Sequence, residues 1–557
     1  MARRSGAPLA KVGRWDVVAL AAIVAFGLWL RVGGLTRNDP WFDDAWVLLT
    51  GRYGIHALLR MSATAPGYDL GLSLLWQSDH GATWLTQLPE LAFGVCGIVA
   101  LYALVTWFGC RRPIPHLAAF VVAVSPVAAT YSTRLKPYAF DLLATCLVLF
   151  LAERWRRAPA PRALAWLGAA SLVVVVSAAS LVVVAAATVM IVVAAAGAPA
   201  LRTQAAAAVA WMAVLLGGLW AASLRLLPPS LAAFWRDQGA MLQLGSIREV
   251  AFSVQQMGSG FIGGLVNTPV HYSLATATRR LADGSLEVYS LRQLRPDELV
   301  LAGCCFLLLG LVCAAPLVAT ARTRCRTIGP GFVASLAVLG GIAGAVMGMS
   351  PFGGGRTDEA LYPAVLILVA LVAESSAGRA SRMLPTWLRW GVAALVCTGM
   401  VFAIAGQRPR YPSSDVRGIA SVVLGRLEPD EVIVVDGDAT FTWAADRLTR
   451  TGVTFNRPSP LSFWTEGFHT VSRDKQVVLA GRILEPDIRL GRLTKHAARV
   501  WLISETLGAV LGTGEANEPL NTPVASPTLD GLRTLGFTRV EARIHRLHTY
   551  AVLLGRG

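Results

Sequence analysis

Long apolar runs separated by short polar connections fill the first 406 residues of this 557-residue chain. About eleven of them are long enough to cross about 30 Å of hydrocarbon as helices, with approximate bounds 17–35, 89–108, 116–131, 137–152, 163–179, 180–198, 205–226, 298–320, 330–349, 359–376 and 388–405. The stretch from 163 to 198 exceeds one ordinary helix, so we divide it near Ser177–Ser180 into a tight helical hairpin. The pattern predicts an α-helical polytopic membrane protein with about 11 transmembrane helices.

The chain changes character at Gln407, where a soluble α/β pattern begins and continues to residue 557. Helices are predicted at 413–424 and 441–448. Strands are predicted at 431–436, 500–503 and 540–554. About 150 residues are enough for a separate core, so we expect a membrane domain at 1–406 and an α/β domain at 407–557. Asp436 and Asp438 follow a predicted strand, but no second constellation accompanies them. We therefore expect this region to bind substrate or to stabilise the protein.

Composition supports the membrane class and argues against nucleic acid as a partner. The chain is 54% hydrophobic and 15% charged, with a mean hydropathy of +0.54, whereas about 25% of a soluble domain is charged. The formal net charge of +16 could indicate nucleic-acid binding, but the basic residues lie in short connections between apolar runs. The eight cysteines lie in or beside apolar runs without a CxxC pair, so the sequence predicts no disulfide framework and no cysteine metal site.

The distribution of basic residues predicts the topology. With a cytoplasmic N-terminus held by an uncleaved signal anchor, the inner connections contain Arg111, Arg112, Arg154, Arg156, Arg157, Arg162, Arg202, Arg322, Arg324, Arg326, Arg379, Arg382 and Arg389. The short outer connections contain only Arg134, Lys136 and Arg356, which is the expected positive-inside bias. We therefore expect a multi-pass protein of the cell inner (plasma) membrane. The loops 36–88 and 227–297 and the C-terminal α/β domain are then extracytoplasmic, and the absence of a GxxxxGK[ST] loop argues against ATP-driven chemistry.

The first outer loop contains the sequence Trp41-Phe42-Asp43-Asp44-Ala45-Trp46. Two adjacent carboxylates among aromatic residues beside a bilayer are candidates for chemistry, because ionisable groups at the membrane are costly. The alternative is a solvated loop whose aromatic residues anchor the first span. Residues 42–60 and 68–77 have helical spacing of apolar positions and predict two helices along the membrane surface, although such helices can also be plain packing elements.

Two further outer segments contain basic residues that the topology rule disfavours. Arg134 and Lys136 need an anionic partner, which could be a phosphate or a carboxylate such as Asp43; the alternative is snorkelling to lipid headgroups. Pro137 predicts that the next helix begins after a break. Three glycines precede Arg356 in the segment 350–363, which predicts an anion site, whereas a glycine-rich turn with positive φ would explain the glycines alone.

The order of these elements resembles the polytopic GT-C glycosyltransferases, in particular the bacterial, family 39-like relatives of protein O-mannosyltransferases and lipid A aminoarabinose transferases. Trp41-Phe42-Asp43-Asp44-Ala45 matches the W-x-D-E-A-like motif of that family, with Asp44 in place of the usual glutamate. Lys136-Pro137-Tyr138-Ala139-Phe140 occupies the place of the second motif, with lysine where arginine is usual. Gly355-Arg356…Leu361-Tyr362-Pro363 resembles the late G-R-x(n)-L-x-P element, and the resemblance covers about 15–430.

The resemblance implies an inverting transfer from a polyprenyl-phosphate-linked sugar. A carboxylate would take the proton of the acceptor hydroxyl; Asp43 is the first choice, with Asp44 supporting it or binding a divalent metal. No His/Asp cluster in the sequence demands a metal or another cofactor. The candidate donor-phosphate ligands are Arg134, Lys136 and Arg356, whose charges would stabilise the leaving group. The candidate substrate contacts are Trp41, Trp46, Tyr68 and Tyr138.

Several alternatives stay open at this point. The loop 227–297 is long enough to form a lid or an acceptor-side wall. The donor sugar could be mannose, arabinofuranose or aminoarabinose, and the acceptor an envelope polysaccharide, a lipid or a protein. A transporter or flippase of lipid-linked saccharides is the competing function, although we find no internal repeat that favours it. A noncatalytic envelope scaffold is the third alternative.

Overall fold

The computed structural model describes most of the helical part and the sheets of the C-terminal part. The described residues are 13–33, 35, 44–45, 47–48, 65–79, 83–226, 240–266, 274–280, 286–292, 294–323, 325, 327–353, 358–380, 415–436, 439, 443, 477–480, 490–491, 494–504, 527–546 and 549–557.

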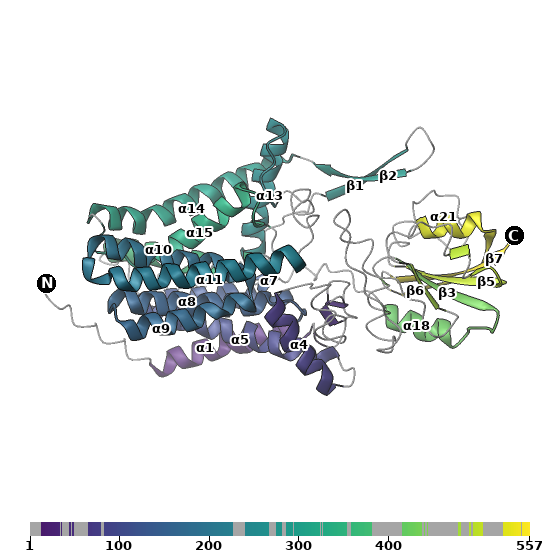
Figure 1. Ribbon diagram of the computed structural model, residues 1–557, viewed down its shortest axis with the longest axis horizontal. Helices are drawn as coiled ribbons and strands as arrows, with labels where there is room; N and C mark the ends of the chain where they lie inside the picture. The colour runs from purple at the N-terminus through teal and green to yellow at the C-terminus, as the bar shows by residue number, and fades with distance from the viewer. Residues whose placement is uncertain are drawn as a thin grey trace.

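The first part of the chain is a bundle of helices (Figure 1). Their bounds are α1 Arg14–Val32, α4 Pro66–Asp79, α5 Thr83–Trp107, α6 Ile114–Val124, α7 Pro126–Tyr131, α8 Tyr138–Arg157, α9 Pro161–Ala170, α10 Leu181–Gly197, α11 Arg202–Leu226, α13 Ile247–Val266, α14 Pro296–Arg322, α15 Phe332–Val346 and α16 Tyr362–Ala380. Each predicted apolar run overlaps one of these helices, except 116–131, which covers both α6 and α7, and 388–405, which lies outside the described residues. The surface helix predicted at 68–77 is α4, whereas the one predicted at 42–60 is described only at 44–45 and 47–48, which are helical.

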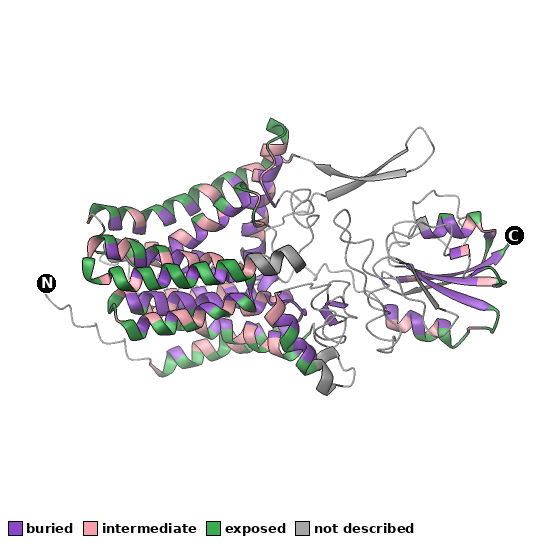
Figure 2. Ribbon diagram, in the orientation of Figure 1, coloured by how far each residue is buried: buried purple, intermediate pink, exposed green. Residues whose placement is uncertain are grey.

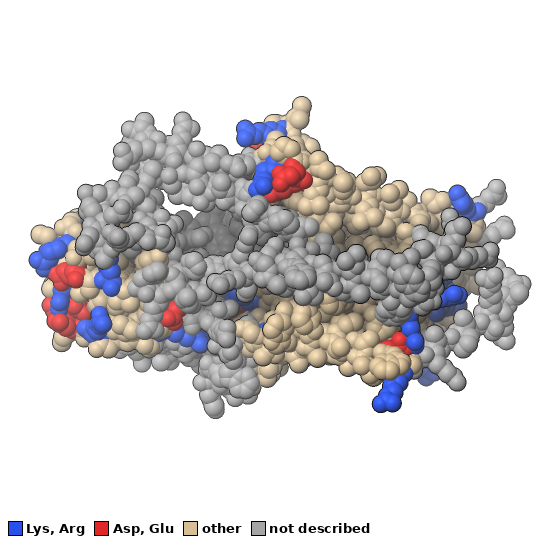
Figure 3. All heavy atoms as spheres, turned by 180° about the vertical axis from the view of Figure 1, so that it is seen from behind, with Lys and Arg blue, Asp and Glu red and all other residues tan. Residues whose placement is uncertain are grey.

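The bundle has the surface of a membrane protein. Five described helices are long and apolar enough to cross a bilayer by length and composition, and their bounds are Arg14–Val32, Leu85–Trp107, Ala178–Gly197, Pro199–Leu219 and Pro296–Arg322. The helices bury one face and expose the other (Figure 2), and the exposed faces include large apolar side chains such as Trp29, Val214 and Leu307. The described surface of the bundle is largely uncharged between the charged groups at its ends (Figure 3). Apolar groups left exposed over helices of this length match a lipid environment.

The helical hairpin predicted at 163–198 divides where expected. A 3₁₀ segment, Ser171–Val175, follows α9, and a second, Ala178–Ser180, precedes α10. Ser177 between them has extended backbone, and its hydroxyl accepts the Ser180 N–H at 3.2 Å. A serine side chain that bonds local backbone competes with the helix, so the two serines explain the break.

The connection 227–297 contains α13 and a hairpin of two antiparallel strands, β1 Leu274–Arg280 and β2 Leu286–Arg292. The sequence predicted no strands in this connection. Its two strands pair residue for residue from Leu274 with Arg292 to Arg280 with Leu286.

The C-terminal part forms a five-stranded sheet in the order β4-β3-β5-β7-β6. The strands are β3 Glu431–Asp436, β4 Val477–Ala480, β5 Arg499–Ser504, β6 Phe537–Arg546 and β7 Thr549–Arg556, with helices α18 Val416–Leu424 and α21 Pro527–Thr534. β4, β3 and β5 are parallel, whereas β7 and β6 add an antiparallel edge. The single stretch predicted at 540–554 is therefore two strands. The domain boundary proposed at 406/407 and the helix predicted at 441–448, apart from Trp443, lie outside the described residues.

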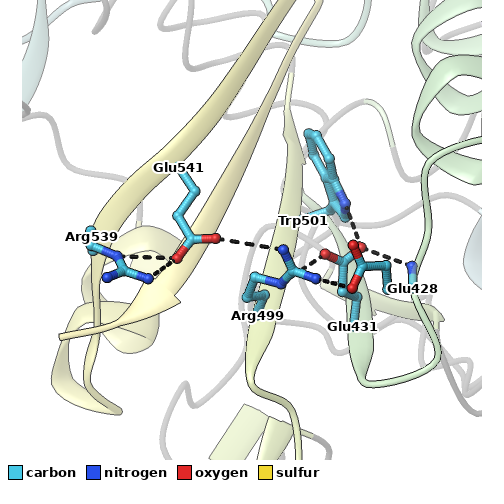
Figure 4. A network of polar contacts seen from close by, with 6 residues as sticks. All are labelled: Glu428, Glu431, Arg499, Trp501, Arg539 and Glu541. Atoms are coloured by element: carbon cyan, nitrogen blue, oxygen red, sulfur yellow. Dashed lines mark hydrogen bonds and ion pairs between the residues drawn. The ribbon is translucent and has the colours of Figure 1, made fainter.

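A charged network ties the amino ends of the sheet strands together (Figure 4). Arg499 at the start of β5 pairs with Glu431 at 3.0 Å and with Glu428 and, at 3.8 Å, with Glu541. The Trp501 indole N–H donates to Glu431 at 3.0 Å. Because ligand sites in such sheets lie at the carboxyl ends of the strands, this network stabilises the domain rather than forming a site. At the carboxyl end, Asp436 accepts the Thr528 hydroxyl at 2.7 Å.

One cluster of buried apolar side chains spans the first loop and the C-terminal domain. It includes Ala45, Val47 and Leu48 of the loop together with Ile419 of α18 and Ile433 of β3. The α/β domain therefore shares a core with the loop that contains the paired carboxylates.

Candidate active site

Asp44 and Arg134 form a buried ion pair. The Arg134 Nη1 atom lies 3.0 Å from Asp44 Oδ2, and the Leu135 backbone N–H donates to Asp44 Oδ1 at 2.9 Å. Asp44 is 1% exposed and Arg134 is 5% exposed. A charge-assisted hydrogen bond in such surroundings fixes both partners. The two segments that the sequence selected independently therefore meet.

We expected the anionic partner of Arg134 to be a phosphate or a carboxylate such as Asp43. Among the described residues, the carboxylate that pairs with Arg134 is Asp44. Lys136 is also buried, at 6% exposure. Neither side chain reaches out to lipid headgroups, so the snorkelling alternative is wrong for both.

Pro137 precedes α8 as predicted. α7 ends at Tyr131, a turn follows, and α8 begins at Tyr138. The rings of Tyr131 and Tyr138 meet edge to face with centroids 4.9 Å apart. Tyr138, a predicted substrate contact, is therefore held at the first turn of α8 beside the Arg134 and Lys136 backbone.

Five of the residues singled out in the sequence lie outside the described part of the chain: Trp41, Phe42, Asp43, Trp46 and Arg356. Their roles stay predictions. Asp43 directly precedes the described Asp44 in the sequence.

The glycine-rich segment is a tight turn at its described end. Gly353 has φ +76°, and its N–H donates to Asp358 Oδ1 at 3.0 Å. A Cβ atom at this position would lie 2.2 Å from the Met257 backbone of α13. Both the backbone conformation and the limited space require glycine at this position. This agrees with the glycine-rich turn, which was the alternative to an anion site.

Gly353→Ala is expected to lower the free energy of unfolding by about 1–3 kcal/mol, because a left-handed backbone and an overpacked contact each cost about that much. Thermal unfolding of the purified protein in detergent measures the loss. Gly217→Ala is the matched control: this helical glycine has no atom within 4 Å of the added Cβ and is expected to be neutral or stabilising. Equal stability of the two variants would contradict the tight-turn assignment.

Three buried carboxyl groups lie close to one another and were not assigned from the sequence. Glu90 of α5 and Glu359 before α16 are 0% exposed, and Asp141 of α8 is 2% exposed. Each lies within electrostatic range of the other two. The sequence contained a signal for Glu90, which is an ionisable residue inside the apolar run 89–108, and such residues are functional candidates by default.

Tyr68 of α4 lies near one member of this carboxyl cluster (Glu90, Asp141 and Glu359) and near Asp44 of the ion pair. It is in electrostatic range of Glu90, Asp44 and Asp69. Burial, followed by the nearby Glu90 carboxyl, raises the pKa of the Tyr68 hydroxyl well above its usual value. The hydroxyl therefore keeps its proton at neutral pH. No hydrogen bond of ordinary geometry to the Tyr68 oxygen is found among the described residues.

Within the described ranges, no group of three or more His, Cys, Asp or Glu side chains has an arrangement that could hold a metal ion. A carboxylate of the first loop can receive a proton, and the buried cations beside it can stabilise a developing negative charge.

No family model and no curated protein match the sequence. Among solved structures, the chain is similar to ArnT from Cupriavidus metallidurans in the apo state, with 14% sequence identity over 97% of both chains and a TM-score of 0.49. It is also similar to the apo oligosaccharyltransferase of Archaeoglobus fulgidus, with 13% identity over 79% of this chain and 64% of that chain and a TM-score of 0.40. Both neighbours have the GT-C fold. At these TM-scores neither similarity carries a functional conclusion.

Proposed function

We propose that this protein is an integral-membrane glycosyltransferase that moves a sugar from a polyprenyl-phosphate-linked donor to a cell-envelope acceptor. The observation that carries the proposal is the buried ion pair of Asp44 and Arg134. It joins two motifs that lie 90 residues apart in the sequence, and the resemblance to GT-C glycosyltransferases implies that both belong to the transfer site. The acceptor is a polysaccharide, a lipid or a protein of the envelope.

The proposed topology supports this function, because it puts the carboxylate loop outside the cell. Extracytoplasmic transfer cannot draw on cytoplasmic nucleotide sugars, so a lipid-linked donor is the source of the sugar. α4 lies at the end of the bundle that faces the C-terminal sheet (Figure 1), and an amphipathic helix there would lie at the lipid boundary where such a donor arrives.

Asp43 is the proposed base. Asp44 already accepts hydrogen bonds from Arg134 and from the Leu135 N–H, and a carboxylate held by a cation and a backbone donor binds a proton less readily. Asp44 therefore positions the loop, and its neighbour takes the proton as the acceptor oxygen attacks the anomeric carbon with inversion. Arg134, Lys136 and Arg356 form the proposed cationic surroundings of the leaving phosphate.

Asp43→Asn is expected to lower the transfer rate by about 100-fold, which is the lower end of the effect of losing a general base. The measurement uses purified protein in detergent with a panel of polyprenyl-phosphate sugars and an envelope extract as acceptor. Asp530→Asn, an exposed carboxylate in α21, controls for the chemical change itself. Undiminished transfer by Asp43→Asn would reject the assigned base.

A flippase for lipid-linked saccharides is the second candidate, because Glu90 and Asp141 are buried carboxyl groups within helices, as transporters often have. The flippase is favoured if the purified protein transfers sugar from no donor and if proteoliposomes that contain it translocate the lipid-linked sugar. Transfer that depends on Asp43 favours the transferase.

A further inference from the structure

Arg31 is a buried arginine near the end of α1, and its guanidinium joins three segments of the bundle. It is 1% exposed. Nη1 donates to Gly27 O of the preceding turn at 2.9 Å and to Ala123 O of α6 at 2.8 Å, and Nη2 donates to Val122 O at 3.1 Å. Nε donates to the hydroxyl of Ser132 at 3.0 Å. A planar guanidinium that meets acceptors in several fixed directions is held in one orientation.

Ser132 is the place where this guanidinium reaches the candidate site. The serine is 0% exposed, directly follows α7 and comes two residues before Arg134. Its hydroxyl accepts the bond from Arg31 and donates to Ala128 O of α7 at 2.5 Å. Both functions of the hydroxyl are therefore used, and they fix the end of α7 against α1 immediately before the turn that contains the cation of the ion pair.

The turn after α7 is shaped by backbone hydrogen bonds that are local and long. The Thr133 N–H donates to Thr130 O at 3.2 Å, and the Arg134 N–H donates to Tyr131 O at 3.3 Å, whereas the usual distance is about 2.9–3.0 Å. Such bonds define the shape of the turn but not where it lies against the other helices. The bond from the guanidinium to Ser132 joins residues 101 positions apart, so it relates the turn to the first span.

Gly94 of α5 leaves the space in which this hydrogen bond lies. A Cβ atom added at Gly94 would lie 2.0 Å from Ser132 Oγ and 3.4 Å from Arg31 Nε. Any larger residue would therefore push the hydroxyl away from the guanidinium. Helices α1, α5 and α7 thus meet at one buried bond, and the packing around it admits a single arrangement.

We propose that Arg31, acting through Ser132, positions the turn that carries Arg134 and so sets where this cation meets the phosphate of the donor. The inference rests on the proposed function, in which Arg134 stabilises the leaving phosphate, and it adds a residue of the first span to the site. Stabilisation of a developing charge depends on groups that are already in place before the reaction. Arg31 acts through another residue, so it is a positioning residue and not a catalytic one.

The position of the turn can be measured without any transfer. Ser132→Ala removes the acceptor of the Arg31 bond, and Gly94→Ala displaces that acceptor while every polar group stays. Arg134 is 5% exposed, so the rate at which phenylglyoxal modifies it in the full-length protein in detergent reports opening of the turn. Mass spectrometry of its peptide measures this rate. Each variant is expected to raise it about 10-fold, which is the change in open population when one hydrogen bond to a charged group is lost.

Two matched variants and one reference arginine complete this experiment. Ser335→Ala removes a serine that is also 0% exposed and also bonded to the carbonyl four residues before it, and Gly303→Ala adds a Cβ atom with nothing within 4 Å. Both are expected to leave the Arg134 rate unchanged. A wild-type rate in both test variants would overturn the positioning role, whether or not the protein is a transferase. So would an equal rise at Arg156, at the other end of α8, because the whole bundle would then have loosened.

Phosphate binding tests the consequence for the site. The product of the proposed transfer, a polyprenyl phosphate, carries the charge that develops on the leaving group. In Ser132→Ala and Gly94→Ala, the Kd of a short-chain polyprenyl phosphate, measured by calorimetry in detergent, is expected to rise about 10-fold, with kcat lowered about 10- to 100-fold, because a displacement of about 1 Å costs this much. Ser335→Ala and Gly303→Ala are expected to change neither.

The two constants separate positioning from a loss of folded protein. Partial unfolding lowers kcat but leaves Kd unchanged, because the molecules that remain folded bind as before. A lower kcat with an unchanged Kd would therefore overturn the link from Arg31 to the phosphate. A wild-type protein that neither transfers sugar nor binds polyprenyl phosphate would reject the proposed function, whereas the modification rates of Arg134 would still decide whether Arg31 and Ser132 position the turn.

Discussion

Arg134→Gln is expected to lower the free energy of unfolding by about 3–5 kcal/mol and to abolish detectable transfer. The substitution leaves Asp44 ionised and buried, and removal of one partner from a buried ion pair costs about this much. Asp44 is 1% exposed and also accepts a hydrogen bond from the Leu135 N–H. Its loop also belongs to the apolar cluster that reaches α18 and β3, so loss of the pair would loosen the loop and the domain together. Thermal unfolding in detergent and the transfer assay measure the two effects.

The double variant separates charge from packing. Asp44→Asn with Arg134→Gln removes both charges, so it is expected to be more stable than Arg134→Gln alone, with a coupling free energy of about 1–3 kcal/mol. Arg533→Gln is the surface control, because Arg533 pairs with Asp530 at 3.3 Å while both are partly exposed, and such pairs contribute at most about 1 kcal/mol. Additive effects of the two single substitutions would mean that the pair contributes no coupling and that Arg134 acts elsewhere.

The helices could be predicted because each apolar run specifies its own helix by local composition. Ser177 marked the break within 163–198, and Pro137 marked the start of α8, since both residues act on the backbone beside them. The hairpin β1–β2 and the strand β4 were missed, because a strand is defined by its distant partner. The stretch 540–554 was predicted as one strand, because the alternation of apolar positions continues through the turn between β6 and β7.

The site could be predicted only to the level of motifs. Sequence identified the paired carboxylates and the two basic residues, but which of two adjacent carboxylates meets Arg134 depends on the direction of each side chain from the loop. Among the described residues, Asp44 pairs with Arg134. Glu90 was overlooked because the run that contains it is apolar enough to predict a span without it. Its importance comes from Asp141 and Glu359, which are distant in sequence and meet it only in the packed bundle.

Arg31→Met is the second large effect that we expect, with a loss of about 3–5 kcal/mol in the free energy of unfolding. Pro126 has no N–H to donate to the Val122 carbonyl at the end of α6. The Arg31 guanidinium donates there instead, with Nη2 to Val122 O at 3.1 Å and Nη1 to Ala123 O at 2.8 Å, and its Nε donates to Ser132 Oγ at 3.0 Å. Without it, buried carbonyls lose their donor, at about 1–3 kcal/mol each.

The same substitution removes the cation that faces Glu359, and this second consequence can be tested separately from the helix-end bonds. Arg31→Met combined with Glu359→Gln is expected to recover about 1–2 kcal/mol relative to Arg31→Met, because the uncompensated carboxyl group is gone. Arg31→Lys is expected to recover the charge but not the bonds, since one ammonium group cannot span acceptors that a planar guanidinium reaches together. Arg14→Gln, an exposed residue at the start of α1, is the control, and denaturation in detergent measures all four variants. If Glu359→Gln restores nothing, Arg31 holds α1 against the α6–α7 break through its bonds alone.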